Sequence, residues 1–305
     1  MNKFTVYSLF FLIGTITIVI SLINIYLGIL LNIIITIIWL IILGLKTIDL
    51  GEKTVLYRKK TSILGFSILL FVLASIIRVT SILIVNAPLE KAAIFVLATG
   101  LLLAEKRDLR EFGFSLMNFK RQILFALIFS ILIPGTYLVI LGSMLKLFAD
   151  AFFSFSIKVF IIVLPFYLVV GLGEEGLFRA YIERRAIQSI GYRKGILWAS
   201  FLFGIWHIYW HIYPLSILPM ITHVLFAFLF GLIFGMIYEK TNSVFVVTLI
   251  HACWDAMVNS IYIPMLNPSA EYIITGTTFF LFFSIIILIT ILVTQRIEPL
   301  IKIGL

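Results

Sequence analysis

The sequence predicts an all-α protein that crosses a membrane many times, as a bundle of about eight to ten transmembrane helices. Hydrophobic residues make up 62% of the 305 residues, charged residues make up only 12%, and the mean hydropathy is +1.19. A soluble domain has about 25% charged residues and about half apolar ones, so this composition excludes a soluble protein. Long apolar runs between short charged segments and the distribution of lysine and arginine are the other two observations.

The apolar runs divide into ten candidate spans of roughly 20 residues. They are residues 4–23, 27–45, 62–84, 89–104, 122–146, 155–182, 195–212, 219–238, 243–263 and 271–294. The first run continues well past the length of a signal peptide, so we expect a retained span. The break near Asn24 is weak, and the span 89–104 is short enough to be tilted, interfacial or re-entrant.

The positive charges predict that both termini lie in the cytoplasm. In that orientation 18 of the 23 lysines and arginines lie in cytoplasmic segments. Those segments are residue Lys3, 46–61, 105–121, 183–194, 239–242 and the C-terminal tail. The other five cations are Arg78, Lys91, Lys146, Lys158 and Arg179. This asymmetry accounts for the net charge of +9 without a nucleic-acid partner.

Arg78 and the charged segment 105–121 each lead to a more specific prediction. Arg78 is a charge in the middle of a span, and we expect it to snorkel to the interface or to pair locally. Segment 105–121 mixes charges with Phe and Leu, which suits either a short helix on the membrane surface or a solvated connector.

The polar residues divide the chain into three parts. All four histidines lie in the last hundred residues, and the adjacent acids Glu174 and Glu175 lie shortly before them. We therefore expect N-terminal transmembrane helices of unknown role in 1–150, the chemistry in a core at 151–265, and a C-terminal helix and tail in 266–305.

Four polar residues at depth point to a reaction site. A charge inside a span costs several kcal/mol unless it is paired or faces water, so each is a functional candidate. At about 1.5 Å per helical residue, Glu174, His207, His251 and Asp255 lie roughly 13–22 Å from the basic edges of their spans. Three spans thus bring these side chains to overlapping depth, in the cytoplasmic half or near the midplane.

Helical spacing separates the two adjacent acids. Glu175 and Arg179 are four residues apart, the usual geometry of an ion pair on one helix face. Glu174 is rotated by about 100° from Glu175 and can face elsewhere. His251 and Asp255 are also one turn apart, and a carboxylate at that spacing can orient an imidazole or share a metal.

His207 and His211 are one turn apart, a spacing that can bind a metal. Trp210 lies between them in a sequence typical of the outer interface, where His211 can simply belong to an aromatic belt. His223, at the start of the next span, has the character of an interface residue. We therefore place His207 in the site and leave His211 and His223 outside it.

Together these residues carry a family resemblance. The motifs EEGLFR at 174–179, FGIWH at 203–207 and HACWD at 251–255 resemble the CPBP family, also called the CAAX protease family. Its members are intramembrane endopeptidases that include the Ras-converting prenyl-protein protease. Each motif alone is weak, but all three in order on membrane spans within about 100 residues are specific. The resemblance covers about 155–265.

The resemblance implies roles for these residues. Glu174 and His207 would activate the attacking water, and His251 with Asp255 would stabilise the oxyanion or bind a metal. Glu175 and Arg179 would position these groups and control their protonation. The family often has asparagine where this chain has Asp255. Two histidines and two carboxylates also suit zinc, with Glu174, His207, His251 and Asp255 as its candidate ligands, so a metalloprotease-like mechanism is open.

The expected substrate is a membrane-anchored peptide or protein tail, reached from the cytoplasmic side of a bacterial plasma membrane. The Ile-, Phe- and Lys-rich composition suggests an AT-rich bacterium, in which bacteriocin or pheromone precursors, or self-immunity, are candidate roles. One alternative is a non-catalytic scaffold or regulator of a sensor kinase or cell-envelope machinery. A proton-coupled transporter is less favoured, because no inverted repeat is present. The sequence does not set the oligomeric state.

Overall fold

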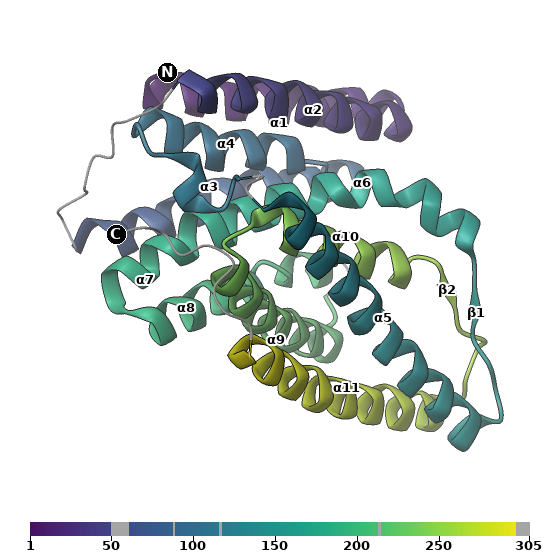
Figure 1. Ribbon diagram of the computed structural model, residues 1–305. Coiled ribbons are helices and arrows are strands. Elements are labelled where there is room, and N and C mark those ends of the chain that lie inside the picture. The colour runs from purple at the N-terminus through teal and green to yellow at the C-terminus, as the bar shows by residue number, and fades with distance from the viewer. Residues whose placement is uncertain (50–60, 88, 116–117, 213–214, 297–305) are drawn as a thin grey trace.

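A computed structural model shows a helical bundle and describes residues 1–49, 61–87, 89–115, 118–212 and 215–296 (Figure 1). Its helices are α1 (Lys3–Ile23), α2 (Ile25–Asp49), α3 (Thr61–Val85), α4 (Lys91–Ala104), α5 (Phe119–Ala149), α6 (Ile157–Glu175), α7 (Arg184–Ile190), α8 (Tyr192–Ile205), α9 (Ile217–Thr241), α10 (Val244–Val258) and α11 (Pro268–Arg296). Strands β1 (Ser154–Phe155) and β2 (Ile261–Tyr262) pair antiparallel. Shorter segments are the 3₁₀ turns Leu109–Phe112 and Ile208–His211 and the π-helix Gly176–Glu183.

The prediction of an all-α polytopic bundle is confirmed. Each of the ten predicted spans corresponds to one helix, namely α1 to α6 and α8 to α11. Within the described residues, seven helices are long and apolar enough to cross a membrane: α1, α2, α3, α5, α9, α11 and the continuous helix from α6 to α7. Helices α4 and α10 are shorter apolar helices of 14 and 15 residues.

The weak break near Asn24 separates two helices. Asn24 has an extended backbone, with φ of −157° and ψ of 119°. Its side-chain oxygen accepts a hydrogen bond from the backbone N–H of Tyr26 at 2.8 Å, which satisfies a donor at the start of α2. A single asparagine therefore ends α1 and begins α2.

The predicted cytoplasmic segments meet at one end of the bundle. Lys3 Nζ lies 3.3 Å from Glu105 Oε1, and Arg185 pairs with the same glutamate. Arg184 Nη1 lies 3.2 Å from Glu239 Oε1. Figure 1 shows the N-terminus and the α7–α8 turn at this end and the two strands at the opposite end. The grouping agrees with the charge-based orientation.

Segment 105–121 is mostly a connector. Its described part has one 3₁₀ turn, Leu109–Phe112, whose Leu109 and Phe112 are buried against the bundle. Most of the predicted segment 46–61 and the C-terminal tail after Arg296 lie outside the described residues.

The short helix α4 is an internal element. Every residue from Lys91 to Leu102 is buried, and α4 packs against α1, α2 and α6. Two glycines of α6 allow close approach on two sides. A Cβ added to Gly173 would lie 2.6 Å from the Lys91 carbonyl oxygen on α4, and one added to Gly171 would lie 2.9 Å from the Thr248 carbonyl oxygen on α10. The run Gly171-Leu-Gly173 thus sets the positions of α4 and α10 beside the two acids that follow it.

Candidate active site

The two adjacent acids lie where the helix changes its winding. Glu174 and Glu175 are the last residues of α6, and the next eight residues, Gly176–Glu183, form a π-helix before α7 continues. Both acids are buried, with 2% and 0% of their surface exposed. Short π segments inside α-helices are frequent at functional sites.

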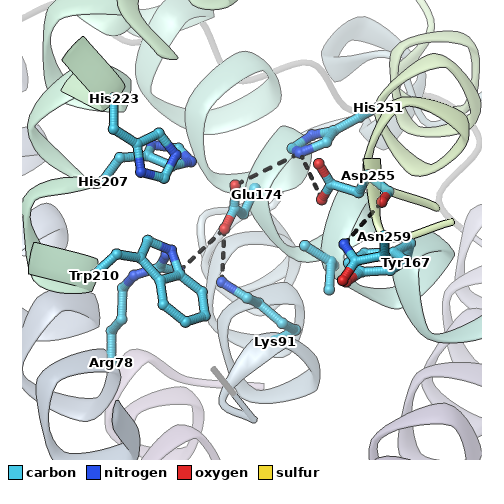
Figure 2. A pocket seen from close by; sticks show the side chains of 11 residues that line it. Arg78, Lys91, Tyr167, Glu174, His207, Trp210, His223, His251, Asp255 and Asn259 are labelled. Atoms are coloured by element: carbon cyan, nitrogen blue, oxygen red, sulfur yellow. Dashed lines mark hydrogen bonds and ion pairs between the residues drawn. The ribbon is translucent and has the colours of Figure 1, made fainter. Parts of the chain in front are cut away.

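The two oxygens of Glu174 have different surroundings. Oε1 accepts hydrogen bonds from Lys91 Nζ at 2.6 Å, Trp206 Nε1 at 2.9 Å and Arg78 Nη1 at 3.1 Å. Oε2 has no hydrogen-bond partner within the described part of the chain and lies 3.9 Å from His251 Nε2 (Figure 2). One oxygen is thus fully bonded, and the other is open.

Sequence reasoning missed the two cations on Glu174. Arg78 comes from α3 and Lys91 from the start of α4, and each side chain is 1% exposed. Of the two expectations for Arg78, snorkelling to the interface is wrong, because its guanidinium pairs in the interior with Glu90, 12 residues along the chain, at 3.3 Å and also with Glu174. The signal was available: a mid-span arginine is a functional candidate by its cost alone. Its partner 96 residues away was not readable from spacing.

Glu175 is the first of three charged side chains that contact one another in the interior. The predicted ion pair is confirmed, with Arg179 Nε 3.0 Å from Glu175 Oε2. Arg179 Nη1 also lies 3.0 Å from Glu183 Oε2, a contact that the sequence analysis missed because it placed Glu183 at the basic edge of the span. All three side chains are 0% exposed. Arg179 is therefore shared between two buried carboxylates.

His251 is held by Glu175 more closely than by Asp255. Its Nδ1 lies 2.7 Å from Glu175 Oε1, and since a carboxylate only accepts, Nδ1 carries the proton. Its Nε2 lies 3.5 Å from Asp255 Oδ2, too far for a well-formed hydrogen bond. Both nitrogens face carboxylates, so both are placed to donate.

His207 follows the end of α8. Its Nδ1 lies 2.8 Å from the carbonyl oxygen of Phe203, which can only accept, so this nitrogen carries the proton, and in a neutral ring Nε2 is then the acceptor. The ring of His223 lies 5.0 Å from that of His207, and His223 Nδ1 lies 3.0 Å from His211 Nε2. The three histidines thus form a row.

A cavity of about 280 Å³ collects these side chains. It is lined by Arg78, Lys91, Tyr167, Val170, Glu174, His207, Trp210, His223, His251, Asp255 and Asn259. In Figure 2, Glu174 lies between the His207–His223 side and the His251–Asp255 side. The convergence of Glu174, His207, His251 and Asp255 expected from depth is present. His223, which sequence reasoning left outside the site, also lines the cavity.

The candidate zinc ligands of the cavity are not arranged as a preformed zinc site. Structural and catalytic zinc needs three or four converging nitrogen, sulfur or oxygen ligands. Among the described residues, no group of three or more His, Cys, Asp and Glu side chains is arranged to hold a metal ion. Glu174 Oε1 already faces two cations, and His251 Nδ1 is bonded to Glu175.

Comparison with known families agrees with this geometry. Residues 156–257, a third of the chain, match the family model described as type II CAAX prenyl endopeptidase Rce1-like. This segment is therefore similar to the CAAX protease family. The match spans all six motif residues of the site, Glu174, Glu175, Arg179, His207, His251 and Asp255. The family-level activity is that of a CAAX-type intramembrane endopeptidase, and seven apolar helices make the chain a multi-pass membrane protein. No curated protein and no solved structure matches the chain significantly.

Proposed function

We propose that this chain cleaves peptide bonds inside the membrane with a water molecule activated by Glu174 and His207. The observation that carries the proposal is the asymmetry of Glu174. Three donors hold Oε1, while Oε2 is open to a cavity that His207 and His251 also line. A general base needs a free lone pair within reach of the proton that it takes, and Oε2 supplies one.

The remaining groups fit the steps of hydrolysis. Water held between Glu174 Oε2 and His207 Nε2 attacks the scissile carbonyl carbon and gives a proton to Glu174. Negative charge develops on the carbonyl oxygen, where N–H from His251 Nε2 is a suitable donor. As the C–N bond breaks, the proton on Glu174 passes to the leaving nitrogen. Glu175 and Arg179 orient His251 from behind and touch no reacting atom.

The substrate class follows from the location of the site. The cavity lies among transmembrane helices, so we propose a membrane-associated peptide or protein tail that enters from the cytoplasmic side of a bacterial plasma membrane. Precursors of bacteriocins or pheromones, with a role in their processing or in self-immunity, are the candidates that the composition of the chain favours.

A zinc-dependent mechanism is the alternative to activation of water by side chains. Glu174, His207, His251 and Asp255 remain the side chains that zinc would use, but their present partners support water activation by side chains alone. We expect purified active protein to contain less than stoichiometric zinc and to keep its activity in a zinc chelator. Stoichiometric zinc together with chelator-sensitive cleavage would establish the metal-dependent route instead.

The test is cleavage of a panel of lipid-anchored peptides by protein reconstituted in vesicles. Glu174→Gln and His207→Ala should each abolish cleavage while expression and membrane insertion persist. Glu271→Gln, which makes the same change at an exposed position of α11, is the matched control and should cleave normally. Full activity in both site variants contradicts the proposal. A cellular phenotype that survives in cleavage-dead variants favours the scaffold or regulator alternative.

A further inference from the structure

Two cations from the N-terminal helices form a buried charge cluster with the proposed base. Lys91 Nζ lies 2.6 Å from Glu174 Oε1 and 2.9 Å from Glu90 Oε1. Arg78 Nη1 lies 3.1 Å and 3.3 Å from the same two oxygens. The four side chains are at most 3% exposed. Two positive and two negative charges therefore share one buried site.

This cluster is more than a neutralising pair for Glu174. A buried charge costs several kcal/mol, so a single cation would be the simplest partner for one carboxylate. Here two cations bind the same oxygen of Glu174, and Glu90 balances the second one. The arrangement keeps the net charge at zero while placing two cationic donors on Oε1.

A neutral donor completes the hold on Oε1. Trp206 Nε1 donates to it at 2.9 Å, and the guanidinium of Arg78 lies 4.4 Å from the centre of the Trp206 ring. Trp206 is fully buried. Three donors from three parts of the chain therefore fix the carboxylate against rotation, and Oε2 stays turned towards the cavity.

The backbone around Lys91 is itself held by the N-terminal helices. Asn32 of α2 donates to the Leu89 carbonyl oxygen at 2.8 Å and accepts from the Ala92 N–H at 3.1 Å. Ser81 of α3 accepts from the Leu89 N–H at 3.0 Å. Asn32 and Ser81 are both 0% exposed. Their contacts fix the start of α4, and Gly173 lets α4 approach Glu174.

We propose that Lys91 and Arg78 are positioning residues of the reaction, which lock one oxygen of Glu174 so that the other is presented to water. This rests on the proposed function and assigns a role to residues 1–150: α2, α3 and α4 complete a site whose motifs all lie in α6 to α10. Both cations bind the Glu174 oxygen that does not take the proton from water, so their effect should be on kcat.

The test compares graded variants in the vesicle cleavage assay. Lys91→Met and Arg78→Met should each lower kcat about 100-fold with little change in KM, because a freed carboxylate leaves its reactive orientation. Lys91→Arg should recover most of the loss by restoring a cationic donor. Lys146→Met removes an exposed lysine that pairs with Asp150 and should leave kcat unchanged.

A double variant distinguishes a loss of positioning from a loss of folding. Glu90→Gln/Lys91→Met removes one charge of each sign, so the cluster stays neutral and the protein should unfold near the wild-type temperature. We still expect its kcat to be about 100-fold lower, because Oε1 has lost its closest donor. Wild-type kcat in a folded double variant and in Arg78→Met would overturn the positioning role.

The outcomes also separate this inference from the proposed function. If the wild-type protein cleaves nothing, or Glu174→Gln cleaves as well as wild type, both ideas fall together. If cleavage depends on Glu174 while the Lys91 and Arg78 variants keep wild-type kcat, only the positioning role falls. Equal losses in Lys91→Met and Lys91→Arg also contradict it. The positioning role requires a cationic donor at residue 91, and arginine supplies one whereas methionine does not.

Discussion

His251 Nδ1 lies 2.7 Å from Glu175 Oε1, although 76 residues separate them, and this contact joins α10 to the last residue of α6. The other oxygen of Glu175 accepts from Arg179 at 3.0 Å. One carboxylate therefore serves two donors and sets the direction in which His251 presents Nε2 to the cavity. Asp255, on the same helix face as His251, lies farther from the imidazole, with its Oδ2 3.5 Å from Nε2.

Glu175→Gln should remove one of the two hydrogen bonds that Glu175 accepts, from His251 and from Arg179. The amide has one oxygen to accept with, while Arg179 and the His251 Nδ1–H are both donors, so one of them loses its partner. We expect kcat/KM to fall about 10- to 100-fold, the usual effect of losing a group that orients a functional histidine. The cleavage assay measures this, with Glu271→Gln as the control at an exposed position. Unchanged kcat/KM would show that Glu175 does not orient His251.

Asp255 should tolerate an amide but not truncation. The Asp255 side chain lines the cavity 3.5 Å from His251 Nε2. An asparagine keeps an oxygen for His251 and adds an N–H that can donate to the oxyanion. We expect Asp255→Asn to keep kcat within about 10-fold of wild type and Asp255→Ala to lose about 100-fold or more, because His251 then lacks the oxygen that faces its Nε2 and the oxyanion donor is no longer oriented. Equal loss in both variants contradicts this role.

Arg179 should be needed for stability. Its guanidinium lies between Glu175 and Glu183, and all three are fully buried. Arg179→Met leaves two buried carboxylates without their cation, which should cost about 3–5 kcal/mol of unfolding free energy. Denaturant unfolding in mixed micelles measures the loss. Arg110→Met breaks a surface pair with Asp108 and should change stability little. A similar effect of the two variants would argue against the buried network.

The close approach of α4 to α6 predicts a steric effect at Gly173. An alanine there would place its Cβ 2.6 Å from the Lys91 carbonyl oxygen, so the helices must separate. We expect Gly173→Ala to cost about 1–3 kcal/mol, typical of overpacking, and to lower cleavage by moving Lys91 from Glu174. Gly135→Ala on α5, where the added Cβ meets no atom within 4 Å, is the matched control. A Gly173→Ala protein with wild-type stability and activity contradicts this packing.

Local pattern was enough for the helices and for part of the site. Apolar run lengths predicted ten of the helices, α1 to α6 and α8 to α11, because each transmembrane helix must satisfy its own backbone hydrogen bonds. Helical spacing gave the Glu175–Arg179 pair, because residues four apart share a helix face. Spacing also put Asp255 beside His251, but it could not show that Glu175 of another helix lies closer.

The sequence by itself determined that this is a polytopic helical protein whose motifs fall in one family and converge at one depth. Only the tertiary structure decided what surrounds Glu174. Lys91 and Arg78 reach it from α4 and α3, and Trp206 from beyond α8, through contacts between residues 32 to 96 positions apart. Sequence periodicity shows which residues are neighbours on one helix, whereas these contacts depend on how different helices pack. Gly173 lets α6 approach α4 closely, and Asn32 of α2 accepts a hydrogen bond from the Ala92 N–H at the start of α4.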